Sequence, residues 1–560
     1  MTFFTDDVAS GRNWRGFERA VARLMIHLGW EDVSVIGGSN DQGGDILATR
    51  LDPSGVKKAW VVQCKAVTGD NYVRVSAINE VTNAVSKYGA QISIVATNGE
   101  FTKSAIKRKE ELTLHGFDTR LWNGKTIQTL LDKAPSEPVG KKKLREYQEK
   151  IVDKVIKKYE SNGKRAFYIV ATGLGKTVIA ATIARKLWEK GLKKILVLCH
   201  ATDLSLQLEQ SFWPLLTKDI PTSVFFNGLP PSLNEGISFG LYQSLKAYLG
   251  GFDSEQFDAI IVDEAHHAMS YGFSLCLNNF HPKFLVGMTA TPWRGDGRVL
   301  SDIFGEALER ISLVDGMAMG YLAKVDYRIF CDNINWKDVS KLSKNKVSIR
   351  DLNKRLFLPQ RDEAVISEIK RVIPELGNAR IAVFSPSVKH AEHFSKLLSV
   401  NGISCANLSC KDKFLRRKRL IDFSTGKYSA ITAVDVMNEG IDIPDVNVLV
   451  FLRATHSRRI FIQQLGRGLR LDESKEKVIV LDFVSDIRRM AELIDLNNEG
   501  KSKGKKYDVV YLRDGFVSFE GKEMKSFVEE WLRDVADLSD QSDDAVLTFP
   551  EVNNGVQCSC

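Results

Sequence analysis

Short runs dominated by apolar residues recur along the middle and C-terminal parts of the chain. They lie at residues 166–171, 194–199, 259–263, 284–288, 380–384, 430–434, 447–452 and 477–482. Such runs, without apolar/polar alternation, are typical of strands that are buried on both faces, as in a parallel sheet. Because helical patterns separate them, we expect βαβ units, and the runs are numerous enough for two parallel sheets.

The first 132 residues follow a different pattern. Apolar residues at positions 14, 17, 21, 24 and 28 line one face of a predicted helix. The segments DVSVIGG, GGDILATRLD and AWVVQCKAV then predict hairpin-like strands, with a Pro-Ser-Gly turn before the last. INEVTNAVSKYG and FTKSAIKRKEELTLHG predict helices on either side of a strand at QISIVAT. This pattern predicts a separate, compact α/β domain.

Changes in composition divide the chain further. The stretch 133–143 mixes Pro, Gly and Lys as linkers do, the apolar periodicity fades at 326–350, and the sequence becomes charged after Asp486. We predict an N-terminal domain at 1–135, a first lobe at 136–325, a connection at 326–375, a second lobe at 376–490 and a short helical C-terminal tail at 491–560.

Composition and charge narrow the class of protein. With 560 residues, 44% hydrophobic and 26% charged, the chain is expected to be a multidomain globular protein. No run approaches the ~18 apolar residues of a membrane span, and the acidic N-terminus is unlike a secretory signal, so a cytoplasmic protein without a membrane partner is expected. The eight cysteines are scattered singly, which predicts buried thiols such as Cys64 and Cys199 and argues against a zinc site.

The chain carries 78 basic and 70 acidic residues, a net charge of +8. Basic residues cluster at 141–145, 411–419 and 501–506. A single cluster of this kind is more often a solvated face or a linker, but together with the motifs below the three are candidate contacts to nucleic-acid phosphates.

A glycine-rich turn, ATGLGKT (171–177), separates an apolar run from an alanine-rich helical stretch. Backbone N–H groups of such a turn can bind nucleotide phosphates. The loop residues expected there are Thr172, Gly173 and Gly175. Lys176 can reach the β- and γ-phosphates and Thr177 can coordinate Mg²⁺. The strict form of this motif has Gly at position 170, where this chain has Val170. Nucleotide binding is therefore not established by this loop alone.

Two adjacent acids, Asp263 and Glu264, end the apolar run at 259–263. Asp263 is placed to hold Mg²⁺, and Glu264 to orient and deprotonate the attacking water. Two acids at the tip of a buried strand are costly without a cation to neutralise them. The pair therefore indicates nucleotide hydrolysis.

These features occur in the order of a helicase motor. Its motifs are LREYQ (144–148), ATGLGKT (171–177), DEAH (263–266), TAT (289–291), VDVMNEGIDIP (434–444) and QQLGRGLR (463–470). Over residues 140–485 the chain resembles the superfamily 2 helicases, nearest the motor subunits of restriction enzymes. The resemblance implies two tandem RecA-like parallel-sheet lobes.

The resemblance also implies roles for individual residues. Gln148 would read adenine, Gly440 and Asp442 would lie in the nucleotide site, and Arg467 and Arg470 would reach the γ-phosphate from the second lobe. An arginine supplied in this way makes hydrolysis conditional on closure of the lobes. Two positions differ from the usual helicase motifs. HATDLSLQ lacks the arginine that often contacts a phosphate, and position 434 is Val where a Thr commonly contacts the nucleic-acid strand. These differences weaken predictions about individual contacts to the strand and leave the prediction of ATP hydrolysis unchanged. The motifs fit a motor that unwinds a duplex and a motor that translocates without separating the strands equally well.

Three polar residues of the N-terminal domain are candidates for phosphodiester chemistry. Asp45 follows two glycines, and Gln63 and Lys65 lie two apart in a strand, so they share a face that Cys64 does not. An acid, an amide oxygen and a lysine could hold Mg²⁺ and activate a water. The spacing alone leaves open that Lys65 is an ordinary solvated residue.

The surrounding segments FERAVARLMIHLGW, DQGGDI, VVQCKA, VATNGEFTKSA and RLWNGKTIQTLL occur in this order within 13–132. They resemble the Mrr-type restriction endonuclease domain, a PD-(D/E)xK nuclease in which Gln replaces the usual acid. The resemblance implies that Asp45 and Gln63 bind the metal, that Lys65 is the catalytic lysine and that Glu18 is a further supporting acid. An alternative for Glu18 is an exposed acid favoured by the positive end of its helix.

The favoured hypothesis is an ATP- and Mg²⁺-dependent endonuclease that acts on double-stranded foreign DNA in restriction or antiphage defence. In a second hypothesis the N-terminal domain binds or senses DNA without cutting, and the motor serves repair or remodelling. A third is an RNA-directed remodeller. No region after residue 490 is large enough for target recognition, so specificity is expected from a partner subunit or from DNA modification.

Overall fold

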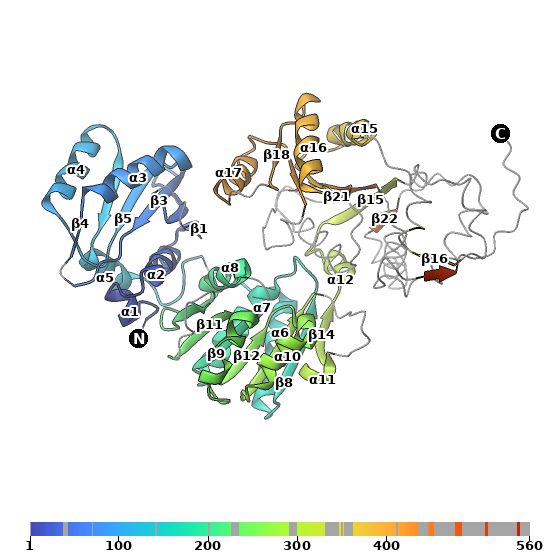
Figure 1. Cartoon of the computed structure of the whole chain (residues 1–560), viewed down its shortest axis with the longest axis horizontal. Helices are drawn as coiled ribbons and strands as arrows, with labels where there is room; N and C mark the ends of the chain where they lie inside the picture. Colours follow the sequence, from blue (N-terminus) through green and yellow to red (C-terminus); the bar gives the residue numbers. More distant parts are fainter. Residues whose placement is uncertain are drawn as a thin grey trace, which may run out of the picture. The chain divides into compact units, whose positions relative to one another are not determined.

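The computed structural model describes most of the chain up to residue 434 and shorter segments after it (Figure 1). The described residues are 2–36, 43–69, 71–140, 143–199, 202–225, 234–290, 300–330, 346–348, 351, 362–409, 413–434, 446–452, 477–483, 510–512 and 546–548. The chain divides into two compact units. The first comprises Met1–Tyr168, Thr177–Met288 and Leu300–Glu309, and the second comprises the remaining residues.

The N-terminal domain is built on a five-stranded sheet in the order β1-β2-β3-β5-β7. Its strands are β1 (Glu31–Val35), β2 (Ile46–Leu51), β3 (Lys57–Cys64), β5 (Ile92–Ala96) and β7 (Asp118–Trp122). β1, β2 and β3 are antiparallel, whereas β3, β5 and β7 are parallel. Short strands β4 (Tyr72–Val73) and β6 (Glu100–Phe101) pair beside it, and the helices are α1 (Asp6–Ala9), α2 (Trp14–His27), α3 (Val75–Tyr88), α4 (Lys103–Leu114) and α5 (Gly124–Lys133). The predicted α/β domain is confirmed.

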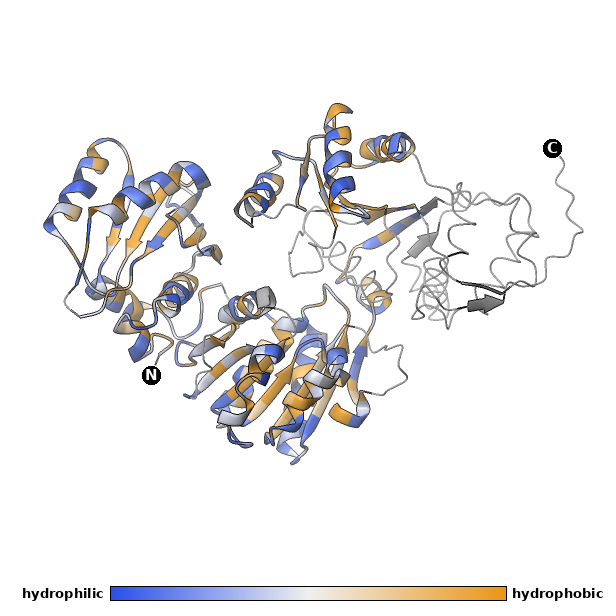
Figure 2. Cartoon of the chain, viewed as in Figure 1, coloured by the Kyte–Doolittle hydropathy of each residue, from blue (hydrophilic) through white to orange (hydrophobic). Residues whose placement is uncertain are grey.

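The two faces of this sheet are covered by different helices (Figure 2). Alternate residues of β3 on one face, such as Val62 and Cys64, pack in one cluster with Phe17 and Leu24 of α2. Val61 faces the other side, where it packs in a cluster with the apolar stripe of α3. This alternation turns Gln63 and Lys65 toward α3, because they follow Val61 at intervals of two.

The first lobe contains a seven-stranded sheet in the order β10-β11-β9-β12-β13-β8-β14. Its strands are β8 (Arg165–Val170), β9 (Lys194–Cys199), β10 (Thr222–Phe225), β11 (Gly236–Leu241), β12 (Ala259–Val262), β13 (Phe284–Thr289) and β14 (Ala307–Ile311). The succession from β10 to β13 is parallel. The main helices are α6 (Glu146–Glu160), α7 (Lys176–Glu189), α8 (Thr202–Phe212), α9 (Tyr242–Lys246), α10 (Tyr271–Asn278), α11 (Ser301–Phe304) and α12 (Leu313–Ala318). The four apolar runs that we predicted as buried strands in this lobe are β8, β9, β12 and β13.

The second lobe contains another parallel sheet, in the order β18-β19-β17-β20-β21-β15-β22. Its strands are β15 (Lys324–Phe330), β17 (Ile381–Phe384), β18 (Cys405–Asn407), β19 (Ala430–Ala433), β20 (Val448–Phe451), β21 (Lys477–Phe483) and β22 (Val510–Leu512). Helices α15 (Asp362–Val372), α16 (Val388–Val400) and α17 (Lys413–Ser424) accompany it. The second predicted parallel sheet is therefore confirmed.

Two expectations about the connections need correction. Residues 326–330, which we assigned to the connection between the lobes, continue β15 inside the second sheet. The described residues of the C-terminal tail are strands and not helices: β22 pairs with β15, and β23 (Val546–Thr548) pairs with β16 (Lys346–Ser348). β22 thus adds a strand to the edge of a sheet whose neighbouring strand lies far away in the sequence.

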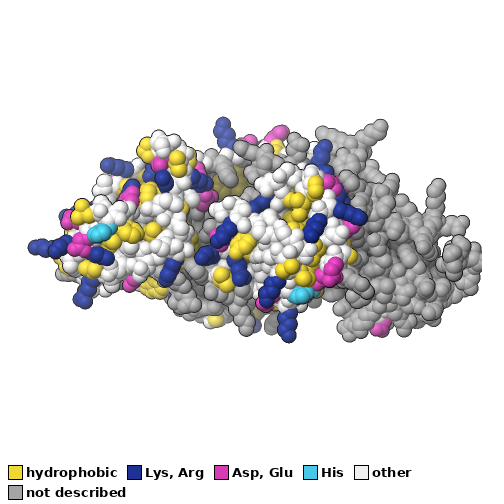
Figure 3. All heavy atoms as spheres, turned by 90° about the horizontal axis from the view of Figure 1, so that it is seen from above, with side chains coloured by type: hydrophobic (Ala, Val, Ile, Leu, Met, Phe, Trp, Pro, Cys, Tyr) yellow, Lys and Arg dark blue, Asp and Glu magenta, His cyan; other side chains and the backbone are white. Residues whose placement is uncertain are grey.

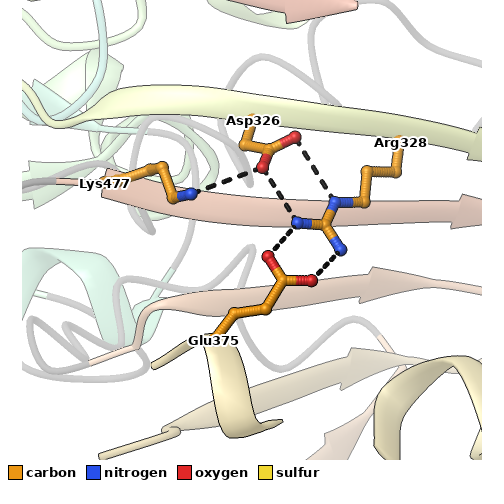
Figure 4. A network of polar contacts seen from close by, with 4 residues as sticks. All are labelled: Asp326, Arg328, Glu375 and Lys477. Atoms are coloured by element: carbon orange, nitrogen blue, oxygen red, sulfur yellow. Dashed lines mark hydrogen bonds and ion pairs between the residues drawn. The ribbon is translucent and has the colours of Figure 1, made fainter. Parts of the chain in front are cut away.

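A buried ionic network fixes β15 in the second lobe (Figure 4). Arg328 is bonded to Asp326 at 3.0 Å and to Glu375 at 2.7 Å, and Lys477 lies 3.5 Å from Asp326. The Arg328 side chain is 4% exposed. Burial alone lowers the pKa of this guanidinium, but the hydrogen bonds to Glu375 and Asp326 outweigh it and raise the pKa above its usual value. The network explains how a strand with two buried charged residues is held inside the sheet.

Within the first unit, the N-terminal domain packs on the first lobe through α2. Arg23 is 1% exposed and donates hydrogen bonds to the carbonyls of Thr217 and Ile220, both at 2.8 Å. Its guanidinium lies 4.5 Å from the ring of Phe3. Trp213 of the lobe belongs to the same apolar cluster as the N-terminal sheet. The two domains therefore share a continuous core at this junction.

The predicted linker is anchored at its start. Nζ of Lys218 donates to the carbonyl of Ala134 at 3.0 Å, and the Lys218 backbone N–H donates to the carbonyl of Ser136 at 2.8 Å. Nδ1 of His27 lies 3.1 Å from the carbonyl oxygen of Pro135.

Among the described residues, no helix is both long and apolar enough to cross a bilayer.

Candidate functional site

The structure brings Asp45 and Gln63 together in the N-terminal domain, where β2 begins and β3 ends. Asp45 immediately precedes β2, and its Oδ2 accepts hydrogen bonds from Nε2 of Gln63 at 2.8 Å and from the backbone N–H of Cys64 at 2.6 Å. The two side chains belong to residues that are only 2% and 4% exposed. The neighbouring strands β2 and β3 thus place both predicted metal ligands in one buried site.

Among the described residues, the side-chain amide oxygen of Gln63 has no hydrogen-bond partner. Because its nitrogen donates to Asp45, the Oε1 oxygen points away from that carboxylate, and it is buried and unpaired. An unpaired buried acceptor costs about 1–3 kcal/mol. A carboxylate and an amide oxygen are both suitable ligands for Mg²⁺. The unpaired oxygen therefore fits a bound cation.

Lys65 lies directly after β3, where its backbone N–H donates to the carbonyl of Ala96 at 2.8 Å. Its Nζ lies 2.7 Å from Oε2 of Glu80, on α3. Lys65 is thus an ion-paired residue and not merely a solvated one. The sequence did not predict Glu80 as a site residue, because only the packing of α3 across β3 brings its carboxylate to Lys65.

Glu18 is buried, with 8% exposed, so the alternative of an exposed acid at the helix terminus is excluded. Burial raises the pKa of the Cys64 thiol well above its usual range, the charges of Asp45 and Glu18 raise it further, and Lys65 lowers it. All three charged groups therefore lie near Cys64. Within the described part of the chain, no three His, Cys, Asp or Glu side chains form a metal-ligand cluster.

The glycine-rich loop at 171–175 has a backbone that only glycine adopts readily. Gly173 and Gly175 have φ values of 89° and 81°, a left-handed conformation that favours glycine. α7 begins at Lys176, so Thr177 lies in its first turn. Thr172 is 9% exposed. A glycine loop that leads into the N-terminus of a long helix can bind phosphate through its backbone N–H groups.

The acids after β12 are held in a strained turn. The backbone N–H of Glu264 donates to Oδ1 of Asp263 at 2.9 Å, and Glu264 itself has φ 48°. Oε2 of Glu264 lies 3.3 Å from Nδ1 of His266, which is 2% exposed. A left-handed residue other than glycine costs free energy, and such strain gathers at functional sites. The turn therefore supports a chemical role for this pair.

Gln148 caps the N-terminus of its own helix, α6. Its Oε1 accepts from the backbone N–H of Arg145 at 3.0 Å, and it is 5% exposed. Its role as the adenine reader stays a prediction. Four other predicted site residues lie outside the described residues: Gly440, Asp442, Arg467 and Arg470.

The folds and sites together define a class: a helicase-type motor of two parallel-sheet lobes joined to a nuclease-type domain. Comparison with known families agrees. Residues 10–131 match the restriction endonuclease family of the Mrr type, 141–294 the res subunit of type III restriction enzymes, and 360–472 the conserved C-terminal domain of helicases. The chain thus carries an Mrr-type nuclease domain and the two motor domains of a superfamily 2 helicase, as the sequence predicted.

Individual proteins are similar to part of this chain. The putative ATP-dependent helicase IRC3 of Saccharomyces cerevisiae is 24% identical over 61% of this chain and 51% of its own length. The endonuclease subunit of the type I restriction enzyme EcoAI of Escherichia coli is 27% identical over 61% of this chain and 46% of its own. This chain therefore spans about half the length of these relatives.

Among solved structures, the ATP-dependent type ISP restriction-modification enzyme LlaBIII bound to DNA matches 94% of this chain and 41% of its own. The TM-score is 0.52 and the sequence identity 17%. This likeness shows a shared fold.

Proposed function

We propose that this protein is an ATP-dependent DNA translocase or helicase with a Mg²⁺-dependent endonuclease activity, acting in restriction of foreign DNA. The observation that carries the proposal is the site formed by Asp45, Gln63 and Lys65 in a domain that is joined to a motor. Relatives named as restriction-enzyme endonuclease subunits support the same combination.

In the motor, the loop at 171–175 binds the nucleotide phosphates, with Lys176 on the β- and γ-phosphates. Thr177 and Asp263 hold Mg²⁺, and Glu264 orients the attacking water. Arg467 and Arg470 complete the site when the second lobe closes. The left-handed glycines of the loop and the strained turn at Glu264 support these roles.

In the nuclease domain, Asp45, the Gln63 oxygen and Glu18 hold Mg²⁺, which supplies a Lewis acid for the scissile phosphate. Lys65 offsets the negative charge that develops on the phosphoryl oxygens in the transition state of phosphodiester cleavage. The buried, unpaired oxygen of Gln63 supports this assignment.

Double-stranded DNA is the proposed partner. On the face drawn in Figure 3, Lys and Arg side chains are spread over much of the described surface among apolar and acidic ones. Such a distribution favours several separate phosphate contacts over one basic groove. Sequence specificity would come from a partner subunit or from DNA modification.

The test incubates purified full-length protein with modified and unmodified duplex DNA, with and without ATP and Mg²⁺. Cutting that is lost in Lys65→Ala but kept in Lys58→Ala, a half-buried lysine near the start of β3, would support the proposal. No cutting by the wild type in any metal would favour the second hypothesis, a DNA-sensing domain on a repair motor. ATPase stimulation by RNA and not by DNA would favour the RNA-directed remodeller.

A further inference from the structure

Glu80 is a charged residue beside the nuclease site that has no part in the mechanism above. It lies on α3, on the face of the sheet toward which Gln63 and Lys65 project. Its Oε2 is 2.7 Å from Nζ of Lys65, and the two side chains are 44% and 37% exposed. The pair is thus formed in the protein alone and remains open to a phosphate that approaches from solvent.

The same turn of α3 supports the loop that carries Asp45. Gly43 has φ 92°, and a Cβ on it would lie 2.5 Å from the carbonyl oxygen of Glu80. A Cβ on Gly44 would lie 2.8 Å from Val61 and 3.1 Å from Tyr88, also on α3. The two glycines before Asp45 are therefore required for the loop to rest directly on the helix.

The turn of α3 at Glu80 therefore contacts both the loop before Asp45 and the side chain of Lys65. Its backbone supports the loop before Asp45, and its carboxylate holds the ammonium group of Lys65. A lysine has a long, flexible stem and a mobile charge. Without a partner on a rigid element, its ammonium group would sample many positions relative to Asp45 and Gln63.

We propose that Glu80 is a positioning residue of the nuclease site, which confines the ammonium group of Lys65 beside the Asp45–Gln63 pair before DNA binds. This inference rests on the proposed nuclease function. The opposing interpretation is a surface ion pair without a role, because exposed pairs contribute little to stability. A test must therefore measure catalysis and the state of Lys65 separately.

The experiment compares the full-length wild type with Glu80→Gln, Glu80→Ala and Glu80→Asp. Glu110→Gln, an exposed acid on α4, serves as the matched control. We expect kcat for Mg²⁺-dependent cutting of duplex DNA to fall about 10- to 100-fold in Glu80→Gln and Glu80→Ala, because misplacement of a catalytic group costs rate. KM for DNA should stay equal or fall, since a negative charge near the phosphate is removed, and Glu80→Asp should recover part of kcat.

A second measurement does not depend on cutting. Acylation of Lys65 by a succinimidyl ester, followed by mass spectrometry, should rise several-fold in Glu80→Gln, whereas that of Lys58 should not change. Unchanged kcat in Glu80→Gln beside an active wild type would overturn the inference and leave the nuclease function standing. An inactive wild type would overturn both. Unchanged acylation of Lys65 would show that Glu80 does not hold it, and would overturn the inference alone.

Discussion

Replacement of Arg23 by Met tests whether the N-terminal domain and the first lobe are stabilised as one unit. The buried guanidinium donates to the carbonyls of Thr217 and Ile220 across the junction, both at 2.8 Å. Burial lowers its pKa to about 9, and the negative charges of Glu209 and Asp219 oppose that shift. Arg23 thus stays charged in spite of burial, and its two carbonyl partners lie in the other domain.

The magnitude follows from the groups that lose their partners. Met keeps much of the apolar stem but leaves the Ile220 carbonyl without a donor among the described residues, at about 1–3 kcal/mol. The Thr217 carbonyl keeps a second donor, the backbone N–H of Ile220 at 3.2 Å, and so loses less. Removing a desolvated charge offsets part of the loss. We expect the free energy of unfolding to fall by about 1–3 kcal/mol. For a unit of this size that lowers Tm by about 2–8 °C.

Scanning calorimetry and tryptophan fluorescence, to which buried Trp213 contributes, would measure the change. The matched control is Arg15→Met on the same helix, where the guanidinium lies 4.8 Å from the ring of its exposed neighbour Trp14. The control should change stability by less than about 0.5 kcal/mol. Equal unfolding temperatures for the two variants would refute the reasoning. Separate transitions of the two domains in the wild type would do so as well.

Further predictions concern both sites and the pH dependence. Glu264→Gln should lower ATP turnover by orders of magnitude in a phosphate-release assay, and retained DNA-stimulated turnover would contradict its role. Asp45→Ala should abolish cutting and leave ATPase activity intact, and loss of both would show that the activities are inseparable. Gly43→Ala should lower the free energy of unfolding in urea by about 2 kcal/mol or more; Gly55→Ala, which also has positive φ but open space around it, should cost less. Burial lowers the pKa of His27 from 6.5 to about 4, so the unfolded chain binds the proton more readily. Stability should fall by up to about 3 kcal/mol as the pH drops from about 6.5 to about 4, and an equal fall in His27→Gln would contradict this cause.

Features that are contiguous in the sequence were predictable from it. The apolar run at 259–263 became β12, with Asp263 and Glu264 at its end, as expected. The glycine-rich turn at 171–175 lies between β8 and α7, as expected. In each case the hydrophobic pattern and the special residues lie within a few positions of one another, so local propensity and local chemistry suffice. The alternation in β3 likewise predicted that Gln63 and Lys65 share a face.

Contacts between distant segments were decided only by the tertiary structure. An apolar pattern shows that a residue faces a core, but it does not show which helix covers that core. The ion pair of Lys65 with Glu80, the burial of Glu18 and the bonds of Arg23 to the first lobe all depend on which helix packs against which strand. The addition of β22 beside β15 depends on the same kind of long-range pairing. Such partners are selected by the summed packing of whole elements, a quantity that no short stretch of sequence contains.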